Sequence, residues 1–185
     1  MTTIGVLALQ GAVSEHVTML EQLGATTKLV LTPQDLEGLA GLIIPGGEST
    51  TIKKLLIREA MLEPLKALIA QGLPVFGTCA GMVLLAQPDA LAALPATVLR
   101  NGFGRQIDSF QIDLNVAGLA APYPAVFIRA PYYSAVDDAV SVLATIDNTR
   151  IVAARYHHLL VTAFHPELTE DSRLHALFLQ MVAER

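Results

Sequence analysis

The sequence predicts an α/β protein built on a doubly wound, mostly parallel sheet, with an antiparallel extension of that sheet in the second half. Two observations predict this fold. In the first 90 residues, short apolar runs alternate three times with helical patterns, as in the strand–helix–strand units of a parallel sheet. Beyond residue 96 the apolar runs continue, but turn-forming residues separate them instead of helices.

Four buried strands are expected in the first half, because each run is apolar on both faces, as strands between two helical layers are. Parallel strands joined by right-handed crossovers end at the same edge of a sheet, so the ends of the first, third and fourth strands meet. Binding crevices in such folds form at that edge. The expected strands are residues 4–9, 27–31, 41–44 and 74–77, and the helical patterns are 14–23, 33–35, 50–58, 62–71 and 80–86.

Short strands dominate the second half. Asn101-Gly102, Pro122 and Asp147-Asn148 are turn-formers between the apolar runs. An antiparallel extension of the sheet fits this pattern, and an amphipathic helix is expected at its end. The expected strands are residues 97–100, 110–114, 125–128, 140–145, 151–156 and 159–163, and the helix is 171–183.

Length and composition restrict the class of protein. The 185 residues are expected to form one domain, 1–185, with a full hydrophobic core. The net charge of −5 and the lack of a basic stripe disfavour nucleic acid as a partner. No apolar stretch approaches the roughly 18 to 20 residues that span a bilayer, and the N-terminus lacks a signal-peptide pattern, so no membrane association is expected. The single cysteine forms no internal disulfide, which indicates a reducing, cytoplasmic setting.

The one cysteine, Cys79, stands at a predicted strand-to-helix corner. The apolar run that ends at Gly77 stops there, and a helical pattern restarts at Ala80. Glycines on both sides allow a tight turn and the close approach of a substrate. A cysteine just ahead of a helix is also favoured as a thiolate. Cys79 is therefore the candidate nucleophile.

A cysteine nucleophile needs a base, and His165 is the best candidate among the five histidines. It follows an apolar run and precedes Pro166, which favours an extended conformation for His165. In an extended segment residues i and i+2 face the same way, so Glu167 is expected to meet His165 and orient it. His16 and His175 lie on helical patterns and are expected to be ordinary surface or half-buried residues.

The neighbours His157 and His158 are expected to form a hairpin turn, since adjacent residues of an extended chain face opposite ways and do not pair on a metal.

The glycine-rich segment 45–50 has two interpretations. It is either a loop that caps the next helix through Ser49 or Thr50, or an oxyanion hole whose backbone N–H groups point into the crevice beside Cys79.

Together these motifs resemble the class I, triad-type glutamine amidotransferases. The match is most similar to the glutaminase subunits of pyridoxal 5′-phosphate synthases, in blocks spread over nearly the whole chain. Two segments depart from that family pattern: residues 87–97 are shorter and richer in alanine, and Tyr156-His157-His158 replaces a small polar turn. The matching blocks are residues 9–12, 45–50, 76–81, 104–106 together with 108–110, 126–131 and 164–168.

The resemblance implies a function and a set of site residues. Cys79, His165 and Glu167 would form the triad that hydrolyses glutamine to glutamate and ammonia through a thioester, with no cofactor and no metal. The oxyanion would be held by the backbone N–H groups of Gly47 and Ala80. A synthase subunit would consume the ammonia in a heteromeric complex, and its docking would complete the oxyanion hole. The residues expected around the glutamine are Gly47, Glu48, Ser49, Arg105, Ile128 and Arg129.

Three alternatives stay open at this point. The chain is compatible with another cysteine hydrolase on the same flavodoxin-like sheet, acting on a different amide or on a peptide. It is also compatible with a non-catalytic regulatory domain that keeps the fold and binds a partner, although an intact set of Cys79, His165 and Glu167 argues against that. Arg129 fits a structural ion pair as well as it fits contact with the substrate.

Overall fold

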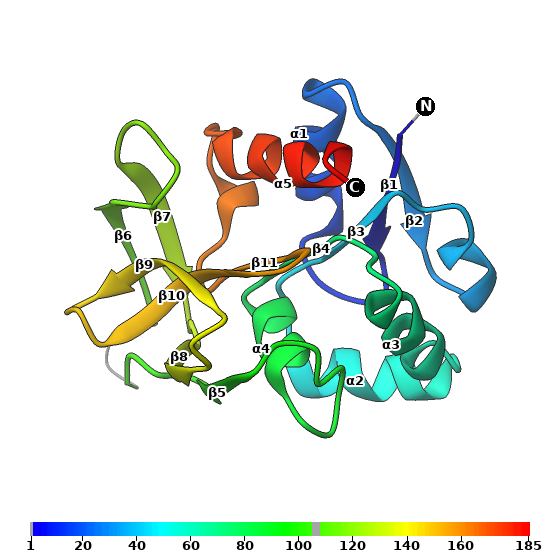
Figure 1. Cartoon of the computed structure of the whole chain (residues 1–185), viewed down its shortest axis with the longest axis horizontal. Helices are drawn as coiled ribbons and strands as arrows, with labels where there is room; N and C mark the ends of the chain where they lie inside the picture. Colours follow the sequence, from blue (N-terminus) through cyan, green and yellow to red (C-terminus); the bar gives the residue numbers. More distant parts are fainter. Residues whose placement is uncertain (1, 105–107) are drawn as a thin grey trace.

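The structure, a computed structural model, describes residues 2–104 and 108–185. Within them a nine-stranded sheet runs through the centre of the molecule in the order β2-β1-β3-β4-β11-β10-β8-β5, with β9 paired to β10 (Figure 1). Five neighbouring strands are parallel, as predicted for a doubly wound sheet. They are β1 (Thr3–Leu7), β2 (Thr26–Val30), β3 (Gly41–Ile44), β4 (Val75–Thr78) and β11 (Leu159–Thr162).

The predicted antiparallel extension is confirmed, with three differences. The last strand, β11, pairs antiparallel with β10 but parallel with β4, so it belongs to the centre of the sheet. A strand that the pattern did not indicate, β8 (Tyr132–Val136), lies between β10 and β5. The strands β6 (Ser109–Leu114) and β7 (Tyr123–Ile128) form a separate two-stranded sheet. The remaining strands of the extension are β5 (Ala96–Leu99), β9 (Ser141–Ile146) and β10 (Arg150–Tyr156).

Helices cover both faces of the parallel part. The helices α1 and α5 lie together on one face, and α2, α3 and α4 lie on the other (Figure 1). Two short 3₁₀ helices, η1 and η2, follow β2 and β11, and η1 begins at Pro33, as predicted, with Thr32 as its cap. The bounds are α1 (Val13–Gln22), η1 (Pro33–Leu36), α2 (Ser49–Arg58), α3 (Leu62–Ala70), α4 (Ala80–Ala86), η2 (Pro166–Leu168) and α5 (Arg173–Ala183).

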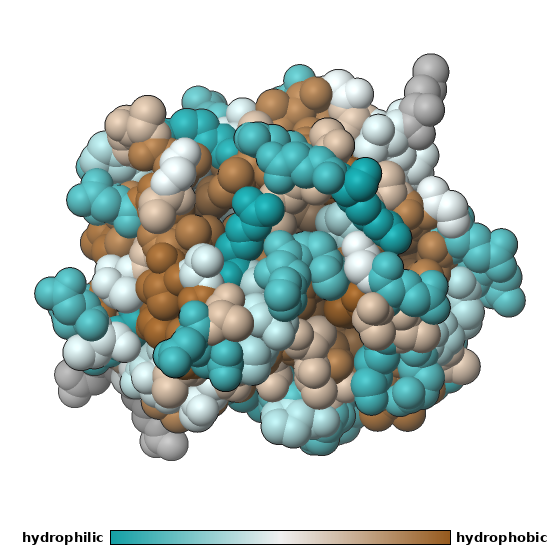
Figure 2. All heavy atoms as spheres, in the orientation of Figure 1, coloured by the Kyte–Doolittle hydropathy of each residue, from teal (hydrophilic) through white to brown (hydrophobic). Residues whose placement is uncertain are grey.

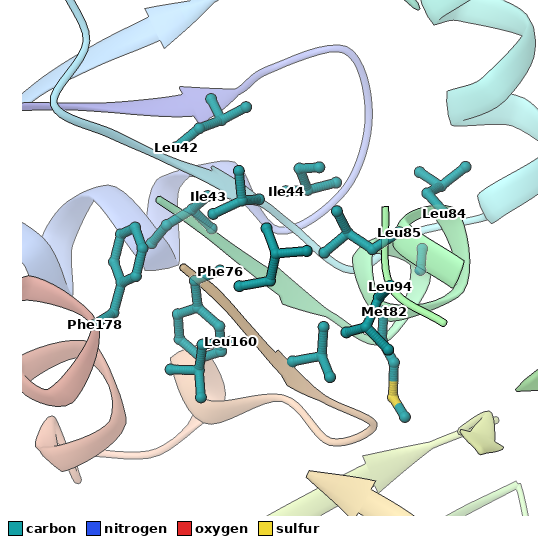
Figure 3. Close-up of a cluster of buried hydrophobic side chains, with 14 of the residues drawn as sticks. Leu42, Ile43, Ile44, Phe76, Met82, Leu84, Leu85, Leu94, Leu160 and Phe178 are labelled. Carbon is teal, nitrogen blue, oxygen red and sulfur yellow. The ribbon is translucent and has the colours of Figure 1, made fainter. Parts of the chain in front are cut away.

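The core lies where these layers meet the parallel strands. In β3 and β4, Ile43 pairs with Phe76, and Leu160 of β11 pairs with Phe76 on the other side. All three side chains are fully buried, and Phe178 of α5 reaches them from the layer above (Figure 3). Every residue of α4 is buried, which explains why that helix is apolar on all sides. This packing holds the ends of β3, β4 and β11 rigidly beside one another.

The molecular surface is mixed in character. On the face shown in Figure 2, hydrophobic side chains gather on the left, over the antiparallel part of the molecule, while hydrophilic side chains cover much of the rest. Across the described residues, the helices are too short or too polar to cross a lipid bilayer.

Candidate active site

The loops after β1, β3 and β4 meet at the predicted edge of the sheet, and together with His165 after β11 they border a cavity of about 570 Å³. Glu167 lies behind His165 rather than in the cavity wall. Arg105, which was predicted to bind substrate, lies outside the described residues. The predicted site residues that line the cavity are Gly47, Glu48, Ser49, Cys79, Ala80, Ile128, Arg129 and His165.

Cys79 occupies the corner between β4 and α4 that the sequence predicted. Its backbone has φ 49° and ψ −100°, a conformation that residues with a side chain rarely adopt. The backbone N–H of Cys79 donates to the carbonyl of Thr162 at 2.8 Å, which ties the corner to the end of β11. The side chain is 8% exposed and faces the cavity. The fold thus holds a thiol in a strained position that projects toward a ligand.

Two glycines make this corner sterically feasible. A Cβ added to Gly81 would lie 2.2 Å from the carbonyl oxygen of Ile44, and one added to Gly77 would lie 2.7 Å from the carbonyl carbon of Gly81. Helix α4 therefore packs against β3 and β4 at a distance that only glycine permits. This close packing sets where Cys79 points.

His165 and Glu167 meet as predicted, but not for the predicted reason. Nδ1 of His165 lies 2.7 Å from Oε1 of Glu167. The segment is not an extended strand, because Pro166 begins the 3₁₀ turn η2 and the carboxylate folds back under the imidazole within that turn. The backbone N–H of His165 donates to the carbonyl of Val126 at 2.8 Å, and the Glu167 side chain is fully buried.

The surroundings of His165 favour its charged form. Burial of the His165 ring lowers its pKa. Hydrogen bonds to Cys79 and Glu167, and the attraction of these two groups for the charged ring, have the larger combined effect and raise the pKa to about 10. The imidazole is therefore protonated at neutral pH, between a thiol and a carboxylate. A cysteine beside a proton-carrying histidine that a buried acid orients is the arrangement of a nucleophile with its acid–base partner.

The glycine-rich loop after β3 packs directly against this pair. A Cβ on Gly46 would lie 2.5 Å from Cε1 of His165 and 3.4 Å from Cβ of Cys79, so the loop leaves no room for a side chain there. Gln10, which lies in the matching block 9–12 but was not predicted as a site residue, supports the loop: its Oε1 accepts from the backbone N–H of Glu48 at 2.9 Å. Gly11, with φ 107°, brings the first loop against the carbonyl of Gly46.

Glu48 caps α2, so the expectation that Ser49 or Thr50 would cap that helix is wrong. The carboxylate of Glu48 accepts from the backbone N–H groups of Thr50 and Thr51 at 3.0 and 2.7 Å. The hydroxyl of Thr51 donates to it as well, and these hydrogen bonds lower the pKa of Glu48 to about 2. Arg100 forms an ion pair with the same carboxylate at 2.9 Å. Arg100 also lines the cavity, although it was not predicted as a site residue.

Ile128, the last residue of β7, and Arg129, which follows it, also border the cavity. The carbonyl of Ile128 lies 4.0 Å from Sγ of Cys79. Arg129 has φ 43°, its backbone N–H donates to the carbonyl of Asp108 at 2.6 Å, and its side chain is exposed. Among the described residues no carboxylate forms an ion pair with Arg129, which favours the ligand-contact alternative over the structural ion pair.

The remaining histidines differ in outcome. His157 and His158 form the predicted turn between β10 and β11, and His157 has φ 51°, a conformation that favours glycine at such a position. The expectation for His16 and His175 is wrong: both are fully buried, and their rings are in contact. In the part of the chain that the structure describes, no three potential ligand side chains gather as a metal site requires.

Comparisons over the whole chain agree with this geometry. The profile of the SNO glutamine amidotransferase family matches residues 6–184. The chain belongs to this family. The pyridoxal 5′-phosphate synthase subunit PdxT of Herpetosiphon aurantiacus is 55% identical, over 96% of this chain and 98% of that protein. The subunit of the same name from Listeria innocua is 53% identical, over 97% of this chain and 98% of that protein.

A solved structure described as a glutamine amidotransferase has the same fold. It aligns with a TM-score of 0.92 at 44% identity and covers 97% of this chain and 98% of its own. The resemblance stated from the sequence motifs is thus confirmed, and the chain is a member of an enzyme family.

Proposed function

We propose that the whole chain, residues 1–185, is one glutaminase domain and that it serves as the glutaminase subunit of a pyridoxal 5′-phosphate synthase. Membership in a glutamine amidotransferase family supports the activity. The two relatives at more than half identity, both named as subunit PdxT of that synthase, support the assignment to vitamin B6 biosynthesis.

One observation carries the assignment of the catalytic residues. Cys79 projects into the cavity from a strained corner, next to an imidazole whose pKa is raised to about 10 and whose Nδ1 lies 2.7 Å from the buried Glu167. We assign Cys79 as the nucleophile, His165 as the acid and base, and Glu167 as the group that orients His165. A raised histidine pKa beside a strained cysteine in a cavity is typical of a functional site and favours catalysis over a noncatalytic role.

The first half of the reaction forms a thioester. The thiolate of Cys79 attacks the side-chain amide carbonyl of glutamine, and the carbonyl oxygen becomes an oxyanion. We assign that charge to the backbone N–H groups of Gly47 and Ala80, two residues that line the cavity. Ala80 is the first residue of α4, so its N–H has no acceptor within the helix. The imidazolium of His165 then gives its proton to the leaving nitrogen, and ammonia departs.

The second half releases glutamate. His165 is now neutral and accepts a proton from water, which attacks the thioester carbonyl. The tetrahedral intermediate collapses, glutamate leaves, and Cys79 regains its negative charge beside the recharged His165. Glu167 stabilises the imidazolium each time it forms.

The cavity also suits the two charged ends of glutamine. Its α-carboxylate requires a cation, and Arg129 is assigned to it, with Arg105 as a second expected contact. Its α-ammonium requires acceptors, and the carboxylate of Glu48, which the helix cap holds in its charged form, is assigned to it together with Ser49. Ile128 contributes its backbone carbonyl beside Cys79.

The proposed partners follow from the chemistry. The substrate is L-glutamine, the ammonia passes to a synthase subunit in a heteromeric complex, and the glutaminase itself uses no cofactor. The single cysteine in its reduced form fits a cytoplasmic setting.

The test is glutamate release from glutamine, with and without the synthase subunit, compared with asparagine and a glutamine-containing peptide. The expected result is hydrolysis of glutamine alone, faster with the synthase, and none by Cys79→Ala. A strong preference for asparagine or the peptide would replace the glutaminase assignment with another cysteine hydrolase.

A further inference from the structure

A chain of buried polar side chains continues behind Glu167, away from the cavity. Oε2 of Glu167, the oxygen that does not meet His165, lies 3.5 Å from Nε2 of His16. Nδ1 of His16 lies 2.8 Å from Nε2 of His175. The same Nε2 of His16 lies 3.2 Å from the hydroxyl of Thr78, the last residue of β4 before Cys79.

Four separate elements supply this chain. His16 comes from α1, Thr78 from β4, Glu167 from η2 and His175 from α5. Helices α1 and α5 lie side by side on one face of the sheet (Figure 1), which brings together histidines that are 159 positions apart. His16, His175 and Thr78 are all 0% exposed, so bulk solvent does not reach their polar atoms.

Both histidines are neutral. Burial lowers the pKa of His16 well below its ordinary value, and the neighbouring His175 and His165 lower it further. Burial likewise lowers the pKa of His175 to about 4. A neutral imidazole carries one N–H and one bare nitrogen, so each contact in the chain has a direction.

The carboxylate decides that direction. Glu167 is acceptor-only when ionised, and its Oε2 has no hydrogen-bond partner among the described residues, although Nε2 of His16 faces it at 3.5 Å. With the proton of His16 on Nε2, that N–H points toward Oε2 of Glu167 and the hydroxyl of Thr78. Nδ1 of His16 is then bare and accepts from the Nε2–H of His175. Nδ1 of His175 is left bare, in agreement with its having no partner in the described structure.

The opposite arrangement is worse on two counts. It would set the bare Nε2 of His16 against the carboxylate oxygen of Glu167, two electron pairs 3.5 Å apart. It would also place an N–H on Nδ1 of His175 with no acceptor, and a buried donor without a partner is among the rarest features of folded proteins.

We propose that His16 is a positioning residue for the triad: its Nε2–H faces Oε2 of Glu167 and stabilises the carboxylate in place, and His175 keeps His16 in the tautomer that carries this proton. The carboxylate that orients His165 then has a ring nitrogen on each side, Nδ1 of His165 at 2.7 Å and Nε2 of His16 at 3.5 Å. Without His16, the carboxylate is free to turn about its last bond, and the imidazole that depends on it loses its alignment with Cys79. The inference rests on the triad assignment of the proposed function.

The first test uses the unmodified chain. Nitrogen-15 NMR of histidine side chains at pH 7 is expected to show His16 and His175 neutral, each protonated on Nε2, with His165 doubly protonated. Assignment to the two residues follows from the loss of one signal set in His16→Gln or His175→Gln. His16 protonated on Nδ1, or on both nitrogens, would overturn the proposal whatever the variants do.

The second test uses two amide variants that differ in where they place a donor. Glutamine at position 16 puts an N–H near the place of Nε2, whereas asparagine reaches only the place of Nδ1. In the complex with the synthase subunit, His16→Asn is expected to lower kcat by about 10- to 100-fold, the range for loss of a partner one layer behind a site, with KM for glutamine unchanged. His16→Gln is expected to retain most of the turnover. Equal losses in both variants would show a merely structural role.

A matched control comes from His158→Asn. His158 is half-buried, its Nε2 lies 2.9 Å from the carbonyl of Ile69, and it is remote from the cavity that holds Cys79. This variant is expected to leave kcat and KM unchanged. Cys79→Ala is assayed in parallel. If it still released glutamate, the proposed function itself would fail, while the tautomer measurement on the unmodified chain would still decide the role of His16 independently.

Discussion

Oε1 of Glu167 lies 2.7 Å from Nδ1 of His165, inside the 3₁₀ turn that Pro166 begins. This contact occupies Nδ1 of the imidazole and leaves its other nitrogen, Nε2, for the hydrogen bond to Cys79. A hydrogen bond within such a short loop is rigid, because only Pro166 separates the two residues and the ring of Pro166 restricts the backbone between them.

Glu167→Gln tests this contact directly. The amide keeps the shape of the side chain but removes the charge, so the imidazolium of His165 is less stabilised. Turnover of glutamine is expected to fall by roughly 10²- to 10⁴-fold, as for the acid of a serine triad, while circular dichroism and the melting curve stay near those of the parent chain. Parent-like kcat in this variant would remove Glu167 from the triad.

The titration of His165 provides a second prediction. Its pKa is raised to about 10, so the ring keeps its second proton as the pH rises through neutrality and loses it only near pH 10. Cys79→Ala removes the hydrogen bond and the attraction of Cys79, and the midpoint is expected to move down toward the ordinary value of about 6.5. The measurement is an NMR titration of the histidine ring in both chains. An unchanged midpoint would show that Cys79 and His165 do not interact.

Gly46 is predicted to be essential because of the space that it leaves. In Gly46→Ala the new methyl group would lie 2.5 Å from Cε1 of His165, so the ring must move. A shift of about 1 Å in a catalytic group costs on the order of 10²-fold in rate, and kcat measured on glutamine is expected to fall by that amount with little change in stability.

Gly72→Ala is the matched control for that variant. No atom lies within 4 Å of the added Cβ, but φ is +95°, so the backbone is strained. This change is expected to cost about 1 kcal/mol of unfolding free energy and to leave kcat unchanged. The two variants together separate a steric effect at the site from a general loss of stability, and equal kcat values in both would contradict the contact.

Arg129→Met tests the assignment of the substrate carboxylate. Loss of a hydrogen bond between charged groups costs about 1.5–3 kcal/mol, so KM for glutamine is expected to rise by roughly 10- to 100-fold. Alkylation of Cys79 by iodoacetamide, which has no carboxylate, is expected to be unaffected. Arg155→Met is the control, because Arg155 lies away from the cavity, where it forms an ion pair with Glu184 at 3.6 Å and donates to the carbonyl of His157. A KM that rises equally in both variants would argue against a specific role for Arg129.

The first four parallel strands and the contact of His165 with Glu167 were predictable from local patterns. Each of these four strands is a short apolar run between helical patterns, and Cys79 stands at one corner between them. His165 and Glu167 are two positions apart, so their contact depends on one turn. The antiparallel half was harder, because a short apolar run does not reveal its partner: residues 159–162 follow β10 through a tight turn, yet they pair with β4 as well.

The histidines behind the triad could not be predicted. The helical patterns around His16 and His175 predict ordinary surface or half-buried residues. Only the packing of α1 beside α5 brings the two rings together. The cap of α2 was missed because Glu is a less common N-cap than Ser or Thr, and it takes that place here with support from Arg100. Gln10 lies in the matching block 9–12, so the sequence indicated that this segment matters. Its contact with the loop after β3 could be found only from the folded structure, because 38 positions separate Gln10 from Glu48.

The most direct measurement of the central claim is covalent labelling by a glutamine-like alkylating analogue, followed by peptide mass spectrometry. Cys79 alone is expected to be labelled, with one label per chain, faster when the synthase subunit is present, and with protection by glutamine. Labelling at the same rate with and without the synthase would contradict activation by docking. A chain that hydrolyses glutamine while Cys79 stays unmodified by the analogue would contradict the assignment of Cys79 as the nucleophile.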